Sequence, residues 1–142
     1  MLKSILATLL LTVGLTARAQ DGQFAKTNES NTTPAVCADA ALSVCATLHF
    51  VSVINTSTEG EFIVHVTTPN ETPISGLKVS LWMNMGGHSH GSAPVEIAAM
   101  NETNQFKISN AWFVMSGPWL VQVEFIADAQ AFKLTIPVTV AE

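Results

Sequence analysis

The stretch LKVSLWMNMGGHSHG, residues 77–91, decides the fold of this chain. Apolar residues fill every second one of its first nine positions (Leu77, Val79, Leu81, Met83 and Met85), and Lys78, Ser80, Trp82 and Asn84 fill the others. Strict alternation is typical of a β-strand that buries one face. The two glycines and the His-Ser-His sequence that follow predict a polar loop at the end of this strand.

Further alternating segments lie on both sides of this strand, separated by turns rich in Asn, Thr, Gly and Pro. We expect strands at residues 48–53, 61–67, 77–85, 95–97, 106–108, 111–127 (interrupted at a Gly-Pro pair) and 132–140. Seven or eight short strands without helical periodicity predict an all-β fold, an immunoglobulin-like β-sandwich of antiparallel strands. Because Pro137 cannot donate a ladder hydrogen bond, the last strand should lie at a sheet edge.

The same stretch concentrates soft metal ligands. It contains two of the four histidines and two of the five methionines in the chain. Thioether sulfur and imidazole nitrogen suit copper, whereas magnesium and calcium prefer oxygen ligands. A methionine on an inward strand position often only fills a gap in the core, and a polar loop is often only solvated. Because the two features adjoin each other, the sequence favours a metal-binding loop.

A second sulfur should reach this loop from another strand. Met85 ends its strand, so we expect it at the rim of the sandwich, and Met115 has inward parity on a later strand. If the two strand ends meet, Met85 and Met115 face each other beneath His88 and His90. Such a three- or four-coordinate site would suit Cu(I). Met83 lies one pleat deeper than Met85, and we expect it in the core.

The first nineteen residues predict a secretory signal peptide. Lys3 precedes an apolar segment at residues 5–15 that is too short to span a bilayer. Small residues at Ala17 and Ala19 offer a cleavage site before Gln20. The mature chain contains no apolar run long enough for a membrane span, so we expect a periplasmic or secreted protein.

We expect three parts in the chain: the signal peptide at 1–19, a polar leader with a Cys-bridged segment at 20–46, and the β-sandwich domain at 47–142. Cleavage would remove Lys3 and Arg18, leaving 4 basic against 11 acidic residues and a net charge of about −7. An acidic chain of this kind is a poor ligand for nucleic acid or for an anionic membrane surface.

Cys37 and Cys45 are the only cysteines. In an oxidising compartment an even pair is most simply a disulfide. A thiolate metal pair fits less well, because the eight-residue spacing lacks the tight hairpin typical of zinc ligands. The segment from Ala35 to Ala46 is rich in alanine, so we expect one or two helical turns there, closed by the cysteine pair.

Two motifs give the chain a family resemblance. They are Met-x-Met-Gly-Gly-His-x-His, ending at His90, and Phe-x-Met-x-Gly-x-Trp-x-Val, beginning at Phe113. Over residues 48–140 the chain resembles the YtkA-like domain family, which is related to the FixH-like proteins. This resemblance implies an exported or membrane-tethered immunoglobulin-like sandwich, often found near copper-handling and respiratory-oxidase functions.

The resemblance also implies ligands. The loop methionine of the family pattern matches Met85, its histidine matches His88 and its later methionine matches Met115. This chain has an extra glycine and a second histidine, His90, so the pattern leaves open which imidazole binds.

The sequence therefore favours an exported module that holds or delivers copper, preferentially Cu(I), without catalysis. The expected partner is a copper-accepting exported protein or an oxidase assembly factor. The alternative is an immunoglobulin-like accessory or interaction domain in which the methionines only pack. An enzyme is disfavoured, because a saturated Met/His site leaves no open position for a substrate and no serine lies in a nucleophile-elbow motif.

A mass measurement tests the expected processing. Because the apolar segment is short and ends in Ala-Arg-Ala, the exported protein should begin at Gln20. Its intact mass under non-reducing conditions should include one disulfide between Cys37 and Cys45. A mass that retains residues 1–19 would contradict the signal peptide, and two free thiols would contradict the disulfide.

Overall fold

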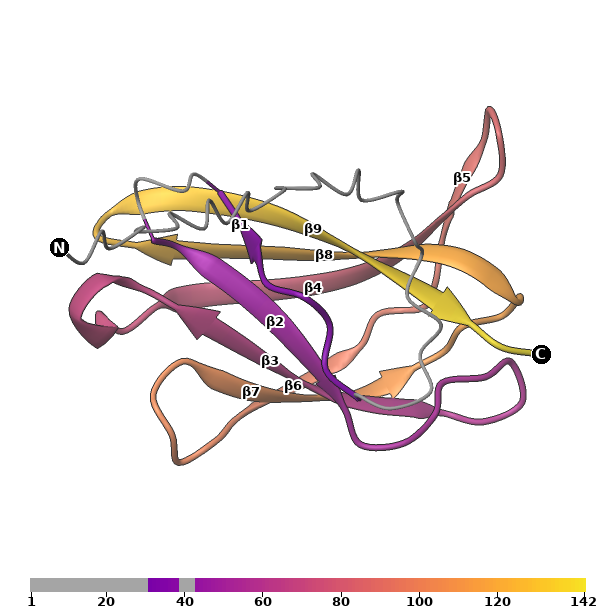
Figure 1. The fold of residues 1–142 in the computed structure, drawn as a ribbon, viewed down its shortest axis with the longest axis horizontal. Coiled ribbons are helices and arrows are strands. Elements are labelled where there is room, and N and C mark those ends of the chain that lie inside the picture. The colour runs from indigo at the N-terminus through magenta and orange to yellow at the C-terminus, as the bar shows by residue number, and fades with distance from the viewer. Residues whose placement is uncertain (1–30, 39–42) are drawn as a thin grey trace, which may run out of the picture.

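The computed structural model describes residues 31–38 and 43–142, and the predicted signal peptide and most of the predicted polar leader lie outside these ranges. Two antiparallel sheets pack face to face (Figure 1). The five-stranded sheet has the order β1 (Val36–Cys37), β2 (Cys45–Phe50), β3 (Gly60–Thr67), β7 (Gln105–Ala111), β6 (Glu96–Ala99). The four-stranded sheet has the order β5 (Ser89–Gly91), β4 (Ser75–Asn84), β8 (Gly117–Ala127), β9 (Gln130–Val140).

This strand order confirms the predicted fold class. Without β1, the two sheets follow the A-B-E-D and C′-C-F-G orders of immunoglobulin-like sandwiches. The edge position predicted from Pro137 is also confirmed, because β9 is the last strand of its sheet. In the described ranges the only helix is a 3-10 turn at Pro69–Glu71, and no helix there is long and apolar enough to cross a membrane.

The core lies between the two sheets and follows from the alternation in the sequence. On β4, Val79, Leu81 and Met83 are buried, while the intervening residues face outward. The same alternation runs along β3, β8 and β9. The largest fully buried side chains are those of Trp119, Phe62, Phe113, Leu48, Leu81, Ile108 and Ile136. Each strand therefore buries one face against the opposite sheet, which is what holds the sandwich together.

Four segments differ from the sequence-based expectation. Residues 51–53 and 112–116 were expected in strands, but β2 ends at Phe50 and β8 begins only at Gly117. Residues 89–91 were expected in a loop, but they form β5, whose three residues are all exposed. The predicted helical turns at residues 35–46 are wrong where the structure describes that segment, because Val36–Cys37 and Cys45–Ala46 belong to strands. Pairing with a neighbouring strand outweighs the weak helical preference of alanine there.

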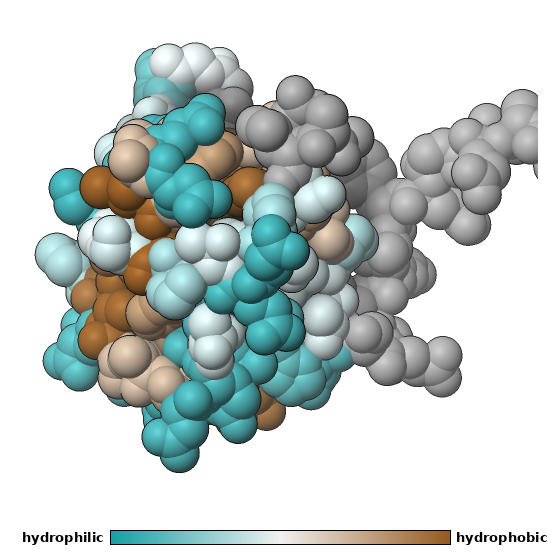
Figure 2. All heavy atoms as spheres, turned by 90° about the vertical axis from the view of Figure 1, so that its left-hand side faces the viewer, coloured by the Kyte–Doolittle hydropathy of each residue, from teal (hydrophilic) through white to brown (hydrophobic). Residues whose placement is uncertain are grey.

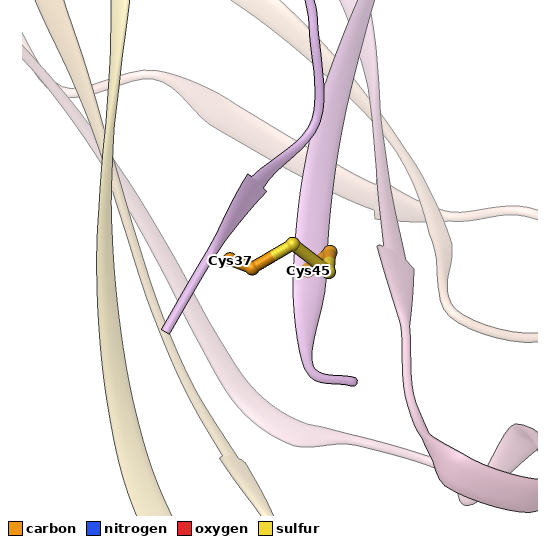
Figure 3. Close-up of a disulfide and its surroundings, with 2 residues drawn as sticks. All are labelled: Cys37 and Cys45. Carbon is orange, nitrogen blue, oxygen red and sulfur yellow. A yellow bond between two sulfur atoms is a disulfide. The ribbon is translucent and has the colours of Figure 1, made fainter. Parts of the chain in front are cut away.

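The predicted disulfide is confirmed. Cys37 on β1 and Cys45 on β2 lie directly opposite each other, and their sulfur atoms are bonded (Figure 3). Upstream of the bridge, the chain continues along β2. The amide of Thr33 donates to the carbonyl of Leu48 over 2.8 Å, and the amide of Phe50 donates to the carbonyl of Asn31. The bridge therefore fixes an added edge strand to the five-stranded sheet.

Exposed apolar side chains occur at both ends of the sandwich. Figure 2 shows the end opposite the β4–β5 hairpin, where apolar atoms gather on one side of an otherwise polar surface. Ile126, near the end of β8, is 44% exposed. Exposed apolar surface is common on soluble proteins, so it does not by itself mark a docking surface.

The bridge should contribute measurably to stability. Replacing both cysteines, Cys37→Ser with Cys45→Ser, removes the cross-link that restricts the unfolded chain and should lower the free energy of unfolding by about 2–3 kcal/mol. Urea unfolding followed by tryptophan fluorescence measures this change. Reduced wild-type protein is the control and should lose a similar amount. A variant as stable as the oxidised wild type would show that the bridge contributes nothing to the free energy of unfolding.

Candidate metal centre

The centre of interest is the hairpin formed by β4 and β5. The turn consists of Gly86 and Gly87, whose φ angles of 65° and 136° lie in the region that favours glycine. Across the turn, the amide of Met85 donates to the carbonyl of His88 over 2.8 Å. The two glycines therefore make a tight reversal that sets the two strands of the hairpin in register.

This register pairs each methionine of the motif with a histidine. Met83 lies opposite His90 in the β4–β5 ladder. Continuing this register by two residues places Met85 opposite His88, in agreement with their backbone hydrogen bond. Because side chains alternate along a strand, all four residues lie on the same face of the hairpin. Two Met–His pairs thus follow one another along that face.

Exposure differs strongly along this face. The hairpin extends beyond the body of the sandwich (Figure 1), and Met85 is 49% exposed. His88 and His90 are exposed as well. In contrast, Met83 is only 7% exposed and belongs to the core, as the sequence predicted. The outer part of the face is open to solvent, and its inner part continues into the apolar interior.

The opposite face of the hairpin is closed by an aromatic ring. Trp82 lies opposite Gly91 in the ladder, and a Cβ added to Gly91 would meet the indole ring at 3.4 Å. The indole Nε1 donates to Oγ of Ser80 over 3.0 Å, which fixes the ring. Below it, the amide of Ser92 donates to the carbonyl of Leu81 over 3.0 Å. The base of the hairpin is therefore well supported.

Met115, the predicted ligand from another strand, lies in the irregular segment 112–116 between β7 and β8. Its side chain is half-buried and packs against the core. Its carbonyl accepts a hydrogen bond from Nε1 of Trp119 over 2.8 Å, and Trp119 lies opposite Met83 in the β4–β8 ladder. Met115 is therefore tied to the residue beside Met83, whereas Met85 belongs to the projecting tip of the hairpin.

The chemistry available in this region is that of soft ligands. Within the described ranges, no three side chains of His, Cys, Asp or Glu gather closely enough to hold a metal ion. The hairpin offers thioethers and imidazoles as soft ligands. The other two histidines, His49 and His65, are exposed and lie on the outer face of the five-stranded sheet, where Nδ1 of His49 is within 2.8 Å of Oγ1 of Thr32.

Sequence reasoning missed one feature of this region, which is the pairing of Met83 with His90. A signal for it was present, because two residues of each kind flank a Gly-Gly pair with equal spacing on both sides. Such symmetry is typical of a two-residue hairpin turn, which pairs the flanking residues in order.

In comparisons with known proteins, no protein family, curated protein or solved structure matches this chain.

Proposed function

We propose that this protein is an exported copper-binding module that holds or delivers copper and catalyses no reaction. The proposed ligands are Met85, His88 and His90 on the hairpin, with Met115 as a ligand from the neighbouring segment. The ion of choice is Cu(I), because thioethers are soft ligands. The sequence resemblance to the YtkA-like family supports the proposal, and so does the disulfide, which is typical of proteins in oxidising compartments.

One observation carries the proposal: the hairpin register sets both histidines of the motif on the same face as its methionines. An exposed strand usually shows charged or small polar residues. Here three exposed positions, Met85, His88 and His90, hold side chains that share an affinity for one class of ion. The exposure of the hairpin tip also suits delivery, because an accepting protein could reach the ligands directly.

A second candidate is an immunoglobulin-like accessory or interaction domain without a metal. It is favoured by exposed apolar residues in loops at the hairpin end, including Val53, which is 71% exposed, and Val114. The absence of charge from these side chains suits contact with a protein surface. A copper titration of the purified mature protein separates the two candidates, because the second requires no binding.

Metal preference tests the proposal directly. Cu(I), added anaerobically in competition with a chromophoric chelator, should bind one ion per chain and clearly more tightly than Zn(II), which thioethers hardly bind. Ligand competition followed by absorbance measures both affinities. Equal affinities for the two ions would mean that the histidines act alone, and failure to bind either ion would leave the accessory-domain function.

The contribution of Met115 can be measured separately. Met115→Leu keeps volume and apolarity, so the cost in folding stability should stay under about 1.5 kcal/mol. If Met115 is a ligand, the variant should bind Cu(I) at least about tenfold more weakly, a loss of about 1.4 kcal/mol. The control is Met100→Leu, in the turn after β6, which should bind as the wild type does. Unchanged binding in Met115→Leu would remove this residue from the site.

A further inference from the structure

A ligand beyond those named above follows from the geometry of the hairpin. Met83 was expected to serve only the core, and its low exposure agrees with that role. Yet its backbone lies directly opposite that of His90, on the strand that also carries Met85. Directly opposed residues point to the same side of a sheet, so the side chains of Met83 and His90 leave the hairpin on the same face.

The dimensions of the ladder allow one ion to reach all four side chains. The amide of Met85 bonds to His88 and the amide of Ser92 bonds to Leu81, so the Met83–His90 pair between them is also of the hydrogen-bonded type. The Cα atoms of such pairs are about 5.5 Å apart. Two pairs that are two residues apart lie about 7 Å from each other along the strand. Four long side chains at the corners of this rectangle can converge above its centre.

The side chain of Met83 extends toward β8. Its terminal methyl lies beside Gly117, where an added Cβ would come within 3.3 Å of the methyl carbon. Because Gly117 has no side chain, this space is open to Met83. Methionine has three rotatable side-chain bonds, so the inferred site requires rotations that bring its sulfur from the Gly117 side toward His90.

The position of Met83 also suits a soft monovalent ion. The strands β8, β4 and β5 are neighbours in the sheet. Their pairing places Trp119, Met83 and His90 side by side on one face. Trp119 is 1% exposed, so the inner side of this row is shielded from water. A ligand at the border between core and solvent would hold one side of the ion in apolar surroundings, where a thioether competes well with water.

We propose that Met83 is a metal ligand, and that Met83, Met85, His88 and His90 together supply the Cu(I) ligands of the β4–β5 hairpin. This inference rests on the proposed copper-binding function. It adds a sulfur ligand from the border of the core to the ligands named in the proposed function.

The first test compares affinities in the folded full-length mature protein. Met83→Leu should bind Cu(I) at least about tenfold more weakly than the wild type, equal to about 1.4 kcal/mol. His90→Ala should weaken binding as well, and the matched control Met100→Leu should not. X-ray absorption of the copper-loaded proteins should count one sulfur fewer in Met83→Leu. Wild-type affinity and an unchanged sulfur count in Met83→Leu, beside weakened binding in His90→Ala, would overturn the inference and leave the proposed function standing.

A second experiment follows the methionine methyl signals of the wild-type protein by NMR as copper is added, and uses variants only to assign these signals. In wild-type protein labelled with ¹³C at the methionine methyls, Cu(I) is diamagnetic and should shift the methyl signals of Met83 and Met85. The signal of Met100 should stay in place, and single Met→Leu variants assign each signal. A Met83 methyl that does not move while Met85 shifts would overturn the inference. If the wild type binds no copper in either experiment, the proposed function itself fails.

Discussion

The buried indole of Trp119 is the constraint on which this end of the sandwich depends. A tryptophan N–H that is removed from water must find an acceptor, or its desolvation costs about 1–3 kcal/mol. Here the carbonyl of Met115 accepts it at 2.8 Å, and Phe113 packs edge-on against the ring with centroids 5.3 Å apart. These two contacts hold the irregular segment before β8 against the core. They also fix the position of Trp119 opposite Met83, from which the hairpin extends.

The pairing of Met83 with Trp119 sets the orientation of the hairpin. Because β4 pairs with β8 on one side and β5 on the other, the face that buries Met83 against the core continues outward to Met85. The tight Gly-Gly turn then returns the chain so that histidines, not the intervening residues, share that face. A turn longer by one residue would shift the returning strand by one position and turn both imidazoles to the other side. The length of the turn is therefore as important for a metal site as the ligands themselves.

Much of the fold could be predicted from the sequence, because alternation reports burial directly. The strands around Leu81, Val64 and Ile136 were found in this way, and Pro137 identified an edge. Residues 89–91 could not be found, since a strand exposed on both faces has no hydrophobic alternation. The pairing of Cys37 with Cys45 was predicted from the cysteine count, but the strand around it was not, because alanine content says little about pairing.

The candidate site was predictable in its composition and only partly in its arrangement. Residue types and spacing marked Met85, His88 and His90 as candidate soft ligands, whereas the assignment of Met83 to the core alone followed from a parity argument. Parity gives the face of a strand, and it does not reveal which partner lies opposite. The role predicted for Met115 needs two strand ends that are thirty residues apart to meet, and such long-range geometry is set by the packing around Trp119.

The low local stability of the hairpin would link its order to metal binding. A two-stranded hairpin without other support is marginally stable in water, and β5 pairs only with β4. Trp82 over Gly91 and the buried Met83 stabilise the base, but the tip with Met85 and His88 extends beyond these contacts. Two glycines allow the turn, and they also increase the entropy that ordering the tip must overcome. An ion bound by both strands would cross-link the tip and offset this entropy, so that metal binding and order in the hairpin would be thermodynamically linked.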